Sequence, residues 1–284
     1  MRWDLTGFAH ARTIDVAGTR VTAVANEERA WEAEVVVTVT VHDQAGPLGA
    51  CLESIAQQEF PGGEVGVVVI EDGSSDDWAA TIGRFRQRLR LVVCGMRCGS
   101  PARARNAALA FVDAALPKAR WVARLDADDR FSTPRSLASA CALGSRRGAC
   151  WVLGGNRLVR EGSLLGRENT ATEALLHAPT VLSILQAMSE GTAENELPSC
   201  NLLLRPRTGW RYPEVESAED HWLVTDLLLN HGASGAILTE PPYCDYNLGG
   251  EVTAANRRTV RYMTSRQALF AQARKWAARL GGDG

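Results

Sequence analysis

The apolar positions in the first half of the chain form two kinds of run. Unbroken runs of β-branched and aliphatic residues, such as Val35–Val41 and Val65–Ile70, are typical of strands buried on both faces of a sheet. Between these runs, Leu48, Leu52 and Ile55 recur at helical spacing. Strand and helix in strict alternation predict a parallel sheet with right-handed crossovers.

The same alternation continues to about residue 130. We expect further strands at Leu91–Val93 and Trp121–Leu125, and a helix at Arg103–Ala115. The fold class is therefore α/β, a Rossmann-like parallel or mixed sheet flanked by helices. In such sheets, ligands bind at the carboxyl ends of the strands.

The second half of the chain has a less regular pattern. We expect helices at 134–143, 177–188, 219–229 and 257–279. We expect strands at 151–158, 199–204, 236–238 and 243–246. Near the N-terminus, Thr13–Val16 and Arg20–Val24 flank Ala17-Gly18-Thr19, which predicts a short hairpin.

Composition and charge exclude several classes of protein. The net charge is −2, with 45% hydrophobic and 23% charged residues, so no bulk field favours nucleic acid or an anionic membrane. No stretch approaches the ~20 apolar residues of a membrane span, and the first residues lack the apolar core of a signal peptide. We expect a soluble cytoplasmic protein, and the abundance of Ala, Arg and Gly suggests a bacterial source.

The seven cysteines fit buried thiols in a reducing cytosol better than a disulfide scaffold, because the chain is long and the count is odd. Cys94 and Cys98 are the only close pair, and no second pair has zinc-type spacing. The cysteine pattern therefore predicts no zinc site.

Three carboxylates follow the fourth expected strand within four residues: Asp126, Asp128 and Asp129. Like charges so close together repel, and a hard divalent cation with oxygen ligands would remove that cost. Carboxylates at i and i+2 of an extended segment point the same way. One could hold a metal while the other holds a neighbouring ligand group. The alternative interpretation is a cap for the helix that follows.

Three further motifs could carry chemistry. The carboxylates of Glu71-Asp72, after the second strand, can accept hydrogen bonds from a base or a ribose, or merely cap a turn. Arg105, early in a helix, can face a phosphate or a base edge, or be a solvated helical arginine. The pair Glu219-Asp220 begins a helix, where the helix dipole also favours carboxylates.

The order of these motifs resembles family 2 of the inverting glycosyltransferases, over roughly residues 35–250. Leu125–Asp129 looks like the metal motif of that family, and Glu71–Asp76 resembles its Asp-Asp-Gly-Ser turn. Ala104-Arg105-Asn106 resembles its Ala-Arg-Asn helix, and Glu219-Asp220 its Glu-Asp base motif. The resemblance implies the A-type nucleotide-sugar transferase fold.

The resemblance also implies roles for individual residues. Asp128 would ligate Mn²⁺ or Mg²⁺, which bridges the donor diphosphate, and Asp220 would be the general base, with Glu219 as second choice. The donor would be a UDP-, GDP- or TDP-sugar, and the acceptor hydroxyl is not identified. Residues expected at the nucleotide and donor are Val41, His42, Asp43, Glu71, Asp72, Arg103, Arg105, Asp126 and Ala127.

The residue pattern and the resemblance together divide the chain into three parts. Residues 1–33 form an N-terminal extension, and residues 34–250 the glycosyltransferase domain. That domain has a nucleotide-binding half, 34–130, and an acceptor half, 131–250. Residues 251–284 form a helical tail that could pack on the domain, pair two subunits as a homodimer, or touch an anionic surface.

Two alternative functions remain open, and the sequence departs from the family pattern or leaves a role open in four places. A nucleotidyltransferase of similar fold would carry a basic, glycine-rich loop after the first strand, but His42–Gly46 has no Lys or Arg. A non-catalytic nucleotide-sugar-binding module would not need the intact carboxylates.

Glu71 stands where the family usually has Asp, and Arg103 could share or replace the role of Arg105. His221 could tune Asp220 or simply pack, and the glycine-rich segment 246–253 could order over the donor diphosphate.

Overall fold

We describe the protein from a computed structural model. It describes residues 1–284 except 1–4, 62–64, 161, 194–195, 250–258 and 281–284. The second part of the glycine-rich segment 246–253 therefore lies outside the described residues.

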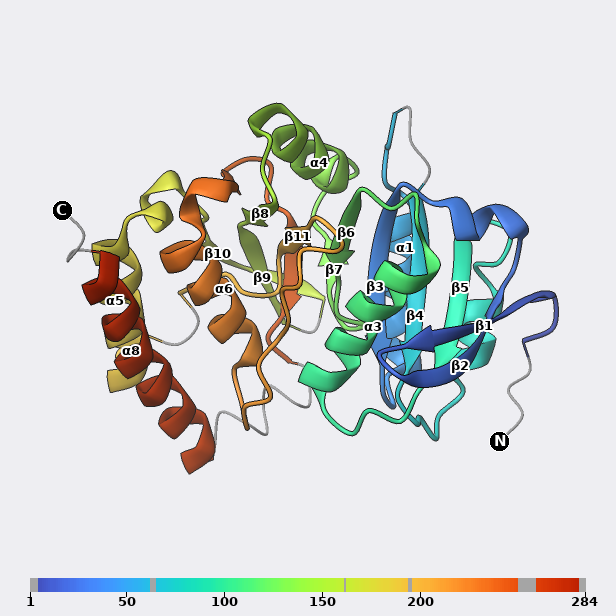
Figure 1. The fold of residues 1–284 in the computed structure, drawn as a ribbon, viewed down its shortest axis with the longest axis horizontal. Helices are drawn as coiled ribbons and strands as arrows, with labels where there is room; N and C mark the ends of the chain where they lie inside the picture. Colours follow the sequence, from blue (N-terminus) through green and yellow to red (C-terminus); the bar gives the residue numbers. More distant parts are fainter. Residues whose placement is uncertain (1–4, 62–64, 161, 194–195, 250–258, 281–284) are drawn as a thin grey trace.

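The described residues form a large mixed sheet and a small one (Figure 1). The large sheet has the strand order β1-β2-β5-β4-β3-β6-β11-β8-β12. Its strands are β1 His10–Val16, β2 Thr19–Ala25, β3 Val35–Val41, β4 Val65–Glu71, β5 Arg90–Gly95, β6 Trp121–Arg124, β8 Trp151–Gly154, β11 Leu202–Leu204 and β12 Gly235–Leu238. The small sheet, in the order β10-β9-β13-β7, contains β7 Arg130–Phe131, β9 Asn156–Arg160, β10 Ser163–Asn169 and β13 Cys244–Asn247.

The centre of the large sheet is parallel, as the alternating pattern predicts. Strands β5, β4, β3 and β6 pair in parallel, so their carboxyl ends lie at one edge of the sheet. Strand β11 then inserts antiparallel between β6 and β8, which makes the sheet mixed. The α/β fold class is confirmed.

Helices cover both faces of the large sheet. The core on one face includes residues of α3 Pro101–Ala115, α5 Ala178–Glu190, α6 Glu219–Asn230 and α8 Val260–Leu280. The core on the other face includes residues of α1 Ala45–Ala56, α2 Trp78–Gly83 and α4 Ser136–Arg147. Strand β3 serves both cores, because Val36 packs with the first and Val35 and Val37 with the second. The sheet is thus buried on both faces, which explains its unbroken apolar strands.

The strand expected at 151–158 is wrong as a single element. The chain forms β8 in the large sheet and β9 in the small one, with Gly155 between them. A Cβ atom on Gly155 would lie 2.8 Å from the backbone oxygen of Asn169. The glycine therefore permits a close backbone approach where the chain passes from one sheet to the other.

The hairpin expected near the N-terminus is present as β1 and β2, and it belongs to the large sheet. Strand β2 pairs antiparallel with β5, with Ala23 opposite Cys94. The arginine-rich tail forms α8, which packs on α5 and α6. Trp276 of α8 meets Trp222 of α6 edge to face, at 6.2 Å between ring centroids.

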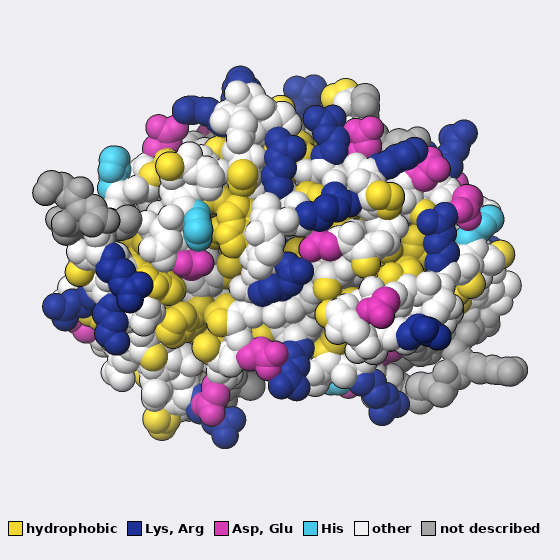
Figure 2. Space-filling view, viewed as in Figure 1, with side chains coloured by type: hydrophobic (Ala, Val, Ile, Leu, Met, Phe, Trp, Pro, Cys, Tyr) yellow, Lys and Arg dark blue, Asp and Glu magenta, His cyan; other side chains and the backbone are white. Residues whose placement is uncertain are grey.

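Two surface properties bear on function. None of the helices in the described ranges is long and apolar enough to cross a membrane. Figure 2 shows basic and acidic side chains interspersed on one face of the molecule, in line with the small net charge. Any anionic ligand therefore has to be recognised by a local group of side chains.

Candidate donor and catalytic site

The end of strand β6 carries a buried ion pair beside the acidic motif. Val122 packs on the α3 face of the sheet, and Arg124, two residues further along β6, follows on the same face because alternate residues of a strand do so. Asp126 lies two residues beyond the end of the strand. Arg124 donates from Nε to Asp126 Oδ1 at 3.0 Å, and its side chain is only 6% exposed. The first carboxylate of the motif is therefore held by the strand that precedes it.

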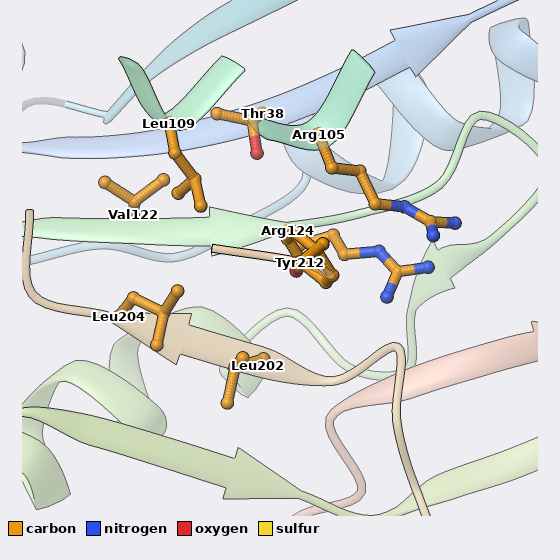
Figure 3. A pocket seen from close by; sticks show the side chains of 8 residues that line it. All are labelled: Thr38, Arg105, Leu109, Val122, Arg124, Leu202, Leu204 and Tyr212. Atoms are coloured by element: carbon orange, nitrogen blue, oxygen red, sulfur yellow. The ribbon is translucent and has the colours of Figure 1, made fainter. Parts of the chain in front are cut away.

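Arg105 reaches the same carboxylate from helix α3. Its Nη2 donates to Asp126 Oδ2 at 3.1 Å, and its Nη1 donates to Glu219 Oε1 on helix α6. Figure 3 shows the guanidinium groups of Arg105 and Arg124 extending in the same direction past the end of β6. Arg105 therefore joins the acidic motif at Asp126 to the Glu-Asp motif, whose Glu219 lies 114 residues after Arg105 in the sequence.

Tyr212 lies against both arginines and is fixed by the residue after Arg105. The ring centroid is 5.7 Å from Cζ of Arg105 and 5.6 Å from Cζ of Arg124, within cation–π range. Asn106 donates from Nδ2 to the Tyr212 carbonyl and accepts from the Tyr212 N–H, each at 2.8 Å. The Ala-Arg-Asn motif thus has a physical basis: its arginine binds carboxylates, and its asparagine holds the aromatic ring beside it.

Asp220 is placed next to Arg124 at the start of α6. Its Oδ2 accepts from Ser199 Oγ at 3.0 Å and lies 3.6 Å from Arg124 Nη1. Its Oδ1 accepts the backbone N–H of His221 at 2.8 Å, and the His221 ring nitrogen Nδ1 is 3.3 Å from the same oxygen. His221 is buried and contacts Asp220 directly.

The two carboxylates beside Arg124 are kept ionised. Burial would raise the pKa of Asp126, but the charges of Arg105 and Arg124 outweigh it and hold the pKa below its usual value. Burial would likewise raise the pKa of Asp220. His221, Arg124 and Arg105 outweigh that effect and hold its pKa well below the usual value. Asp220 is therefore an anion at neutral pH and able to accept a proton.

The pKa of Asp128 is shifted in the opposite direction. Burial, and then the negative charge of Asp126, raise the pKa of Asp128 to about 6. Among the described residues, no basic side chain forms an ion pair with Asp128, whereas Asp126 has two arginines. A carboxylate left without a counter-charge in a half-buried position is a suitable ligand for a hard divalent cation.

The charges of the whole group agree with a divalent cation. Arg105 and Arg124 supply two positive charges, against four negative charges from Asp126, Asp128, Glu219 and Asp220. The excess of two negative charges equals the charge of one Mn²⁺ or Mg²⁺ ion. The residues present therefore fit the metal that the sequence suggests.

The loops after β3 and β4 are fastened to one another. Asp43, which has a positive φ of 51°, accepts the N–H of Ser75 at 2.6 Å. Asp76 in turn accepts the N–H of Ala45 at 2.6 Å. Each loop thus caps the other, and the carboxyl ends of the two strands form one rigid edge.

Asp72 connects this edge to the loop after β5. Its Oδ1 accepts the backbone N–H groups of Cys98 and Gly99, the latter at 3.2 Å. His42 Nδ1 is 2.8 Å from the Asp72 carbonyl, and the ring of His42 is exposed. Asp72 therefore shapes the region where the sequence places the nucleotide.

Other expected donor residues have different surroundings. Glu71 is 3% exposed, and its carboxylate accepts the N–H of Ser74 in its own turn. Arg103 is exposed and pairs with Glu214 at 2.8 Å, away from the Asp126 group that Arg105 joins. Val41 and Ala127 are buried, and the Val41 carbonyl accepts the Asp72 N–H at 2.9 Å.

The structure adds Arg124, Tyr212 and Ser199 to the candidate site. A sequence signal for Arg124 was its position two residues before Asp126 in a strand that is otherwise apolar.

Behind the two guanidinium groups is a cavity of about 10 Å³, lined by Thr38, Leu109 and Val122 among others (Figure 3). A space of that size holds at most about one water molecule, so it is not the donor site.

Comparison with known proteins finds a family model and solved structures of similar fold. The family model described as glycosyl transferase family 2 matches residues 36–140, from β3 into α4. S. aureus TarS 1-349 in complex with UDP-GlcNAc is 21% identical, with a TM-score of 0.61 and coverage of 87% of this chain and 71% of that chain. Mannosyltransferase PcManGT from Pyrobaculum calidifontis, in complex with GDP-Man and Mn²⁺, is 17% identical, with a TM-score of 0.51 and coverage of 87% and 74%. No curated protein matches the chain.

The fold is thus the A-type fold of nucleotide-sugar transferases. The sequence match covers the parallel strands, the Asp72 turn and the Asp126–Asp129 motif. On that match, residues 36–140 are similar to the glycosyl transferase family 2 domain, so this part of the chain resembles enzymes of the glycosyltransferase class.

Proposed function

We propose that this enzyme transfers a sugar from a nucleoside diphosphate sugar to an acceptor hydroxyl, with inversion at the anomeric carbon. One observation carries the proposal. The guanidinium group of Arg124 contacts both Asp126, in the donor motif, and Asp220, in the base motif. The group that would hold the donor sugar and the group that would accept a proton are therefore neighbours.

Asp220 is the general base in this proposal. As a carboxylate at neutral pH, it accepts the proton of the acceptor hydroxyl while oxygen attacks the anomeric carbon. Positioned proton transfer of this kind contributes about 10²–10⁴-fold to rate. A single displacement, with no covalent intermediate on the enzyme, inverts the anomeric configuration.

The departing nucleoside diphosphate needs charge stabilisation on the other side of the sugar. Asp128 would hold Mn²⁺ or Mg²⁺, which supplies Lewis-acid stabilisation of the diphosphate. Asp126, fixed by Arg105 and Arg124, would orient the ribose or the sugar. Asp72 and the loop of Cys98 and Gly99 would contact the nucleobase or ribose.

Two facts about related folds support a nucleoside diphosphate sugar as donor. S. aureus TarS was crystallised with UDP-GlcNAc, and PcManGT with GDP-Man and Mn²⁺. These ligands belong to those proteins, and they define the panel with which this chain should be tested.

The test is a panel of UDP-, GDP- and TDP-sugars incubated with the enzyme in Mn²⁺, in Mg²⁺ and after EDTA treatment. We expect release of nucleoside diphosphate from one donor class, restored to the EDTA-treated enzyme by the metal. Release of pyrophosphate from a nucleoside triphosphate and a sugar phosphate, with no nucleoside diphosphate from any donor, would overturn the proposal.

A further inference from the structure

A second group of metal-ligating side chains lies beneath the acidic motif. Asp129 ends the motif, Cys200 precedes strand β11, and Cys244 begins strand β13. One ligand atom of each lies within 4.8 Å of the other two, and all three side chains are buried. Three segments that are far apart in the sequence therefore bring two thiols and a carboxylate together.

The carboxylate of Asp129 is incompletely satisfied. Its Oδ1 accepts the N–H of Asn247 at 2.8 Å, but its Oδ2 has no hydrogen-bond partner in the described part of the chain. Asp129 is 1% exposed, so solvent does not complete the bonding. A buried carboxylate oxygen without a partner is costly, which calls for a proton or a cation at this point.

The nearby thiols do not supply the missing hydrogen bond. Cys200 donates from Sγ to Asn201 Oδ1 at 2.7 Å, so its proton points away from Asp129. Cys244 makes no hydrogen bond to the free oxygen either, because Asp129 Oδ2 has no partner among the described residues. A thiol has one proton to donate, so the proton of Cys200 is not available to Asp129.

The donor atoms indicate which cation would fit. Two sulfur ligands select a soft or borderline ion such as Zn²⁺ over Mn²⁺ or Mg²⁺. In a tetrahedral site, zinc bonds of about 2.3 Å to sulfur and about 2.0–2.2 Å to carboxylate oxygen place the ligand atoms about 3.4–3.8 Å apart. The ligand atoms of the cluster lie within 4.8 Å of one another, so they would close by up to about 1 Å when the ion binds. Asn201 Oδ1, already beside Cys200 Sγ, offers an oxygen for a fourth position.

We propose that Asp129, Cys200 and Cys244 form a structural zinc site, separate from the donor metal at Asp128. The ion would fasten the acidic motif to the starts of β11 and β13. Asp129 already holds β13 through the Asn247 N–H, and Ser199, next to Cys200, donates to Asp220. A zinc ion here would therefore fix the relative positions of the donor motif and the base. This inference does not depend on the proposed sugar transfer.

Metal content tests the site without any activity assay. The enzyme is produced with zinc in the medium, freed of any histidine tag, dialysed against EDTA to remove weakly held ions, and analysed by inductively coupled plasma mass spectrometry. We expect about one zinc per chain, as in structural sites. The Cys200→Ser and Cys244→Ser variants should lose it. Cys141→Ser, a buried cysteine outside the cluster, and Asp128→Asn should keep it.

A measurement on the wild-type chain covers the case in which the cysteine variants fail to fold. Cobalt added to metal-free enzyme should give the thiolate-to-cobalt charge-transfer absorption of a site with sulfur ligands. Wild-type enzyme that carries no zinc after zinc-supplemented growth and gives no such absorption would overturn the proposal. The cluster would then be a thiol network with a protonated Asp129. Loss of the zinc in Asp128→Asn alone would also overturn it, because the ion would then belong to the donor site.

Discussion

Arg124 Nη1 lies 3.6 Å from Asp220 Oδ2, although the two residues are 96 positions apart in the sequence. Arg124 ends a parallel strand, and Asp220 begins a helix on the face of the sheet that also carries α3. The same guanidinium group binds Asp126. The contact therefore defines where the two halves of the candidate site meet.

The first prediction concerns this buried arginine. Arg124→Gln leaves Asp126 and Asp220 with less compensating charge in a buried position. Removing one partner of a buried ion pair costs about 3–5 kcal/mol. We expect a loss of that size in the free energy of unfolding, measured by urea denaturation. Arg124→Lys should recover part of it, because it restores the charge without the paired guanidinium geometry.

An exposed ion pair provides the matched control. Arg103 pairs with Glu214, and these side chains are 60% and 57% exposed, compared with 6% for Arg124. Exposed pairs contribute about 0–1 kcal/mol, so Arg103→Gln should change stability little. Equal losses in the two variants would contradict the assignment of Arg124 as the ion-pair centre of the site.

The second prediction concerns the donor metal. Asp128→Asn removes the carboxylate that has no basic partner among the described residues. We expect Mn²⁺-dependent binding of UDP or GDP, measured by isothermal titration calorimetry, to weaken by more than about 10-fold, which is what loss of even an outer-shell partner of a metal costs. Asp226→Asn, at the far end of α6, is the control and should bind as the wild type does. Unchanged metal dependence in Asp128→Asn would place the metal elsewhere.

The third prediction concerns pH and Asp220. Its pKa is held well below 3.8 in the folded protein, because His221, Arg124 and Arg105 outweigh burial. A lowered folded-state pKa stabilises the protein above the unfolded-state value and ceases to do so as pH falls through the folded-state value. Asp220→Asn should therefore be less stable than the wild type at pH 7, and the gap in urea midpoint should narrow as pH falls below about 4. A difference in urea midpoint that stays constant with pH would mean that the negative charge of Asp220 does not stabilise the folded protein.

The fourth prediction concerns packing beneath the sheet. A Cβ atom on Gly144 of α4 would lie 2.6 Å from the ring of Trp121, which is 2% exposed. Gly144→Ala should destabilise the fold by about 1–3 kcal/mol, the usual cost of overpacking. In α1, Gly46 has nothing within 4 Å of the added atom, so Gly46→Ala should be neutral or stabilising by up to about 1 kcal/mol. Thermal or urea unfolding of both variants distinguishes the two environments, and a stabilised Gly144→Ala would show that the Trp121 ring moves aside freely.

The parallel half of the fold follows from the sequence for a simple reason. Strands such as Val35–Val41 are buried on both faces, so their apolar runs are unbroken and unambiguous. The change from β8 to β9 was harder to predict, because strand residues lie directly on both sides of Gly155 and only a close backbone approach marks the break. The position of β11 between β6 and β8 depends on long-range pairing, which local periodicity does not encode.

The candidate site shows the same division. Asp126, Asp128 and Asp220 are recognisable because carboxylates at strand and helix ends stand out in the sequence. Arg124 is hidden in a strand, and its importance appears only when Asp220 comes to lie beside it. No spacing motif in the sequence reveals the cluster of Asp129, Cys200 and Cys244, because its residues come from three separate segments.

Sugar transfer by Asp220→Asn is the most direct test of the account. Nucleoside diphosphate release is measured with the donor that the wild type uses, alongside calorimetric binding of the corresponding nucleoside diphosphate and Mn²⁺. We predict binding within error of the wild type and a fall in kcat of about 10²–10⁴-fold, the contribution of a positioned base. Transfer at the wild-type rate, with Asp220 replaced, would contradict the assignment of Asp220 as the base and the central role of its contact with Arg124.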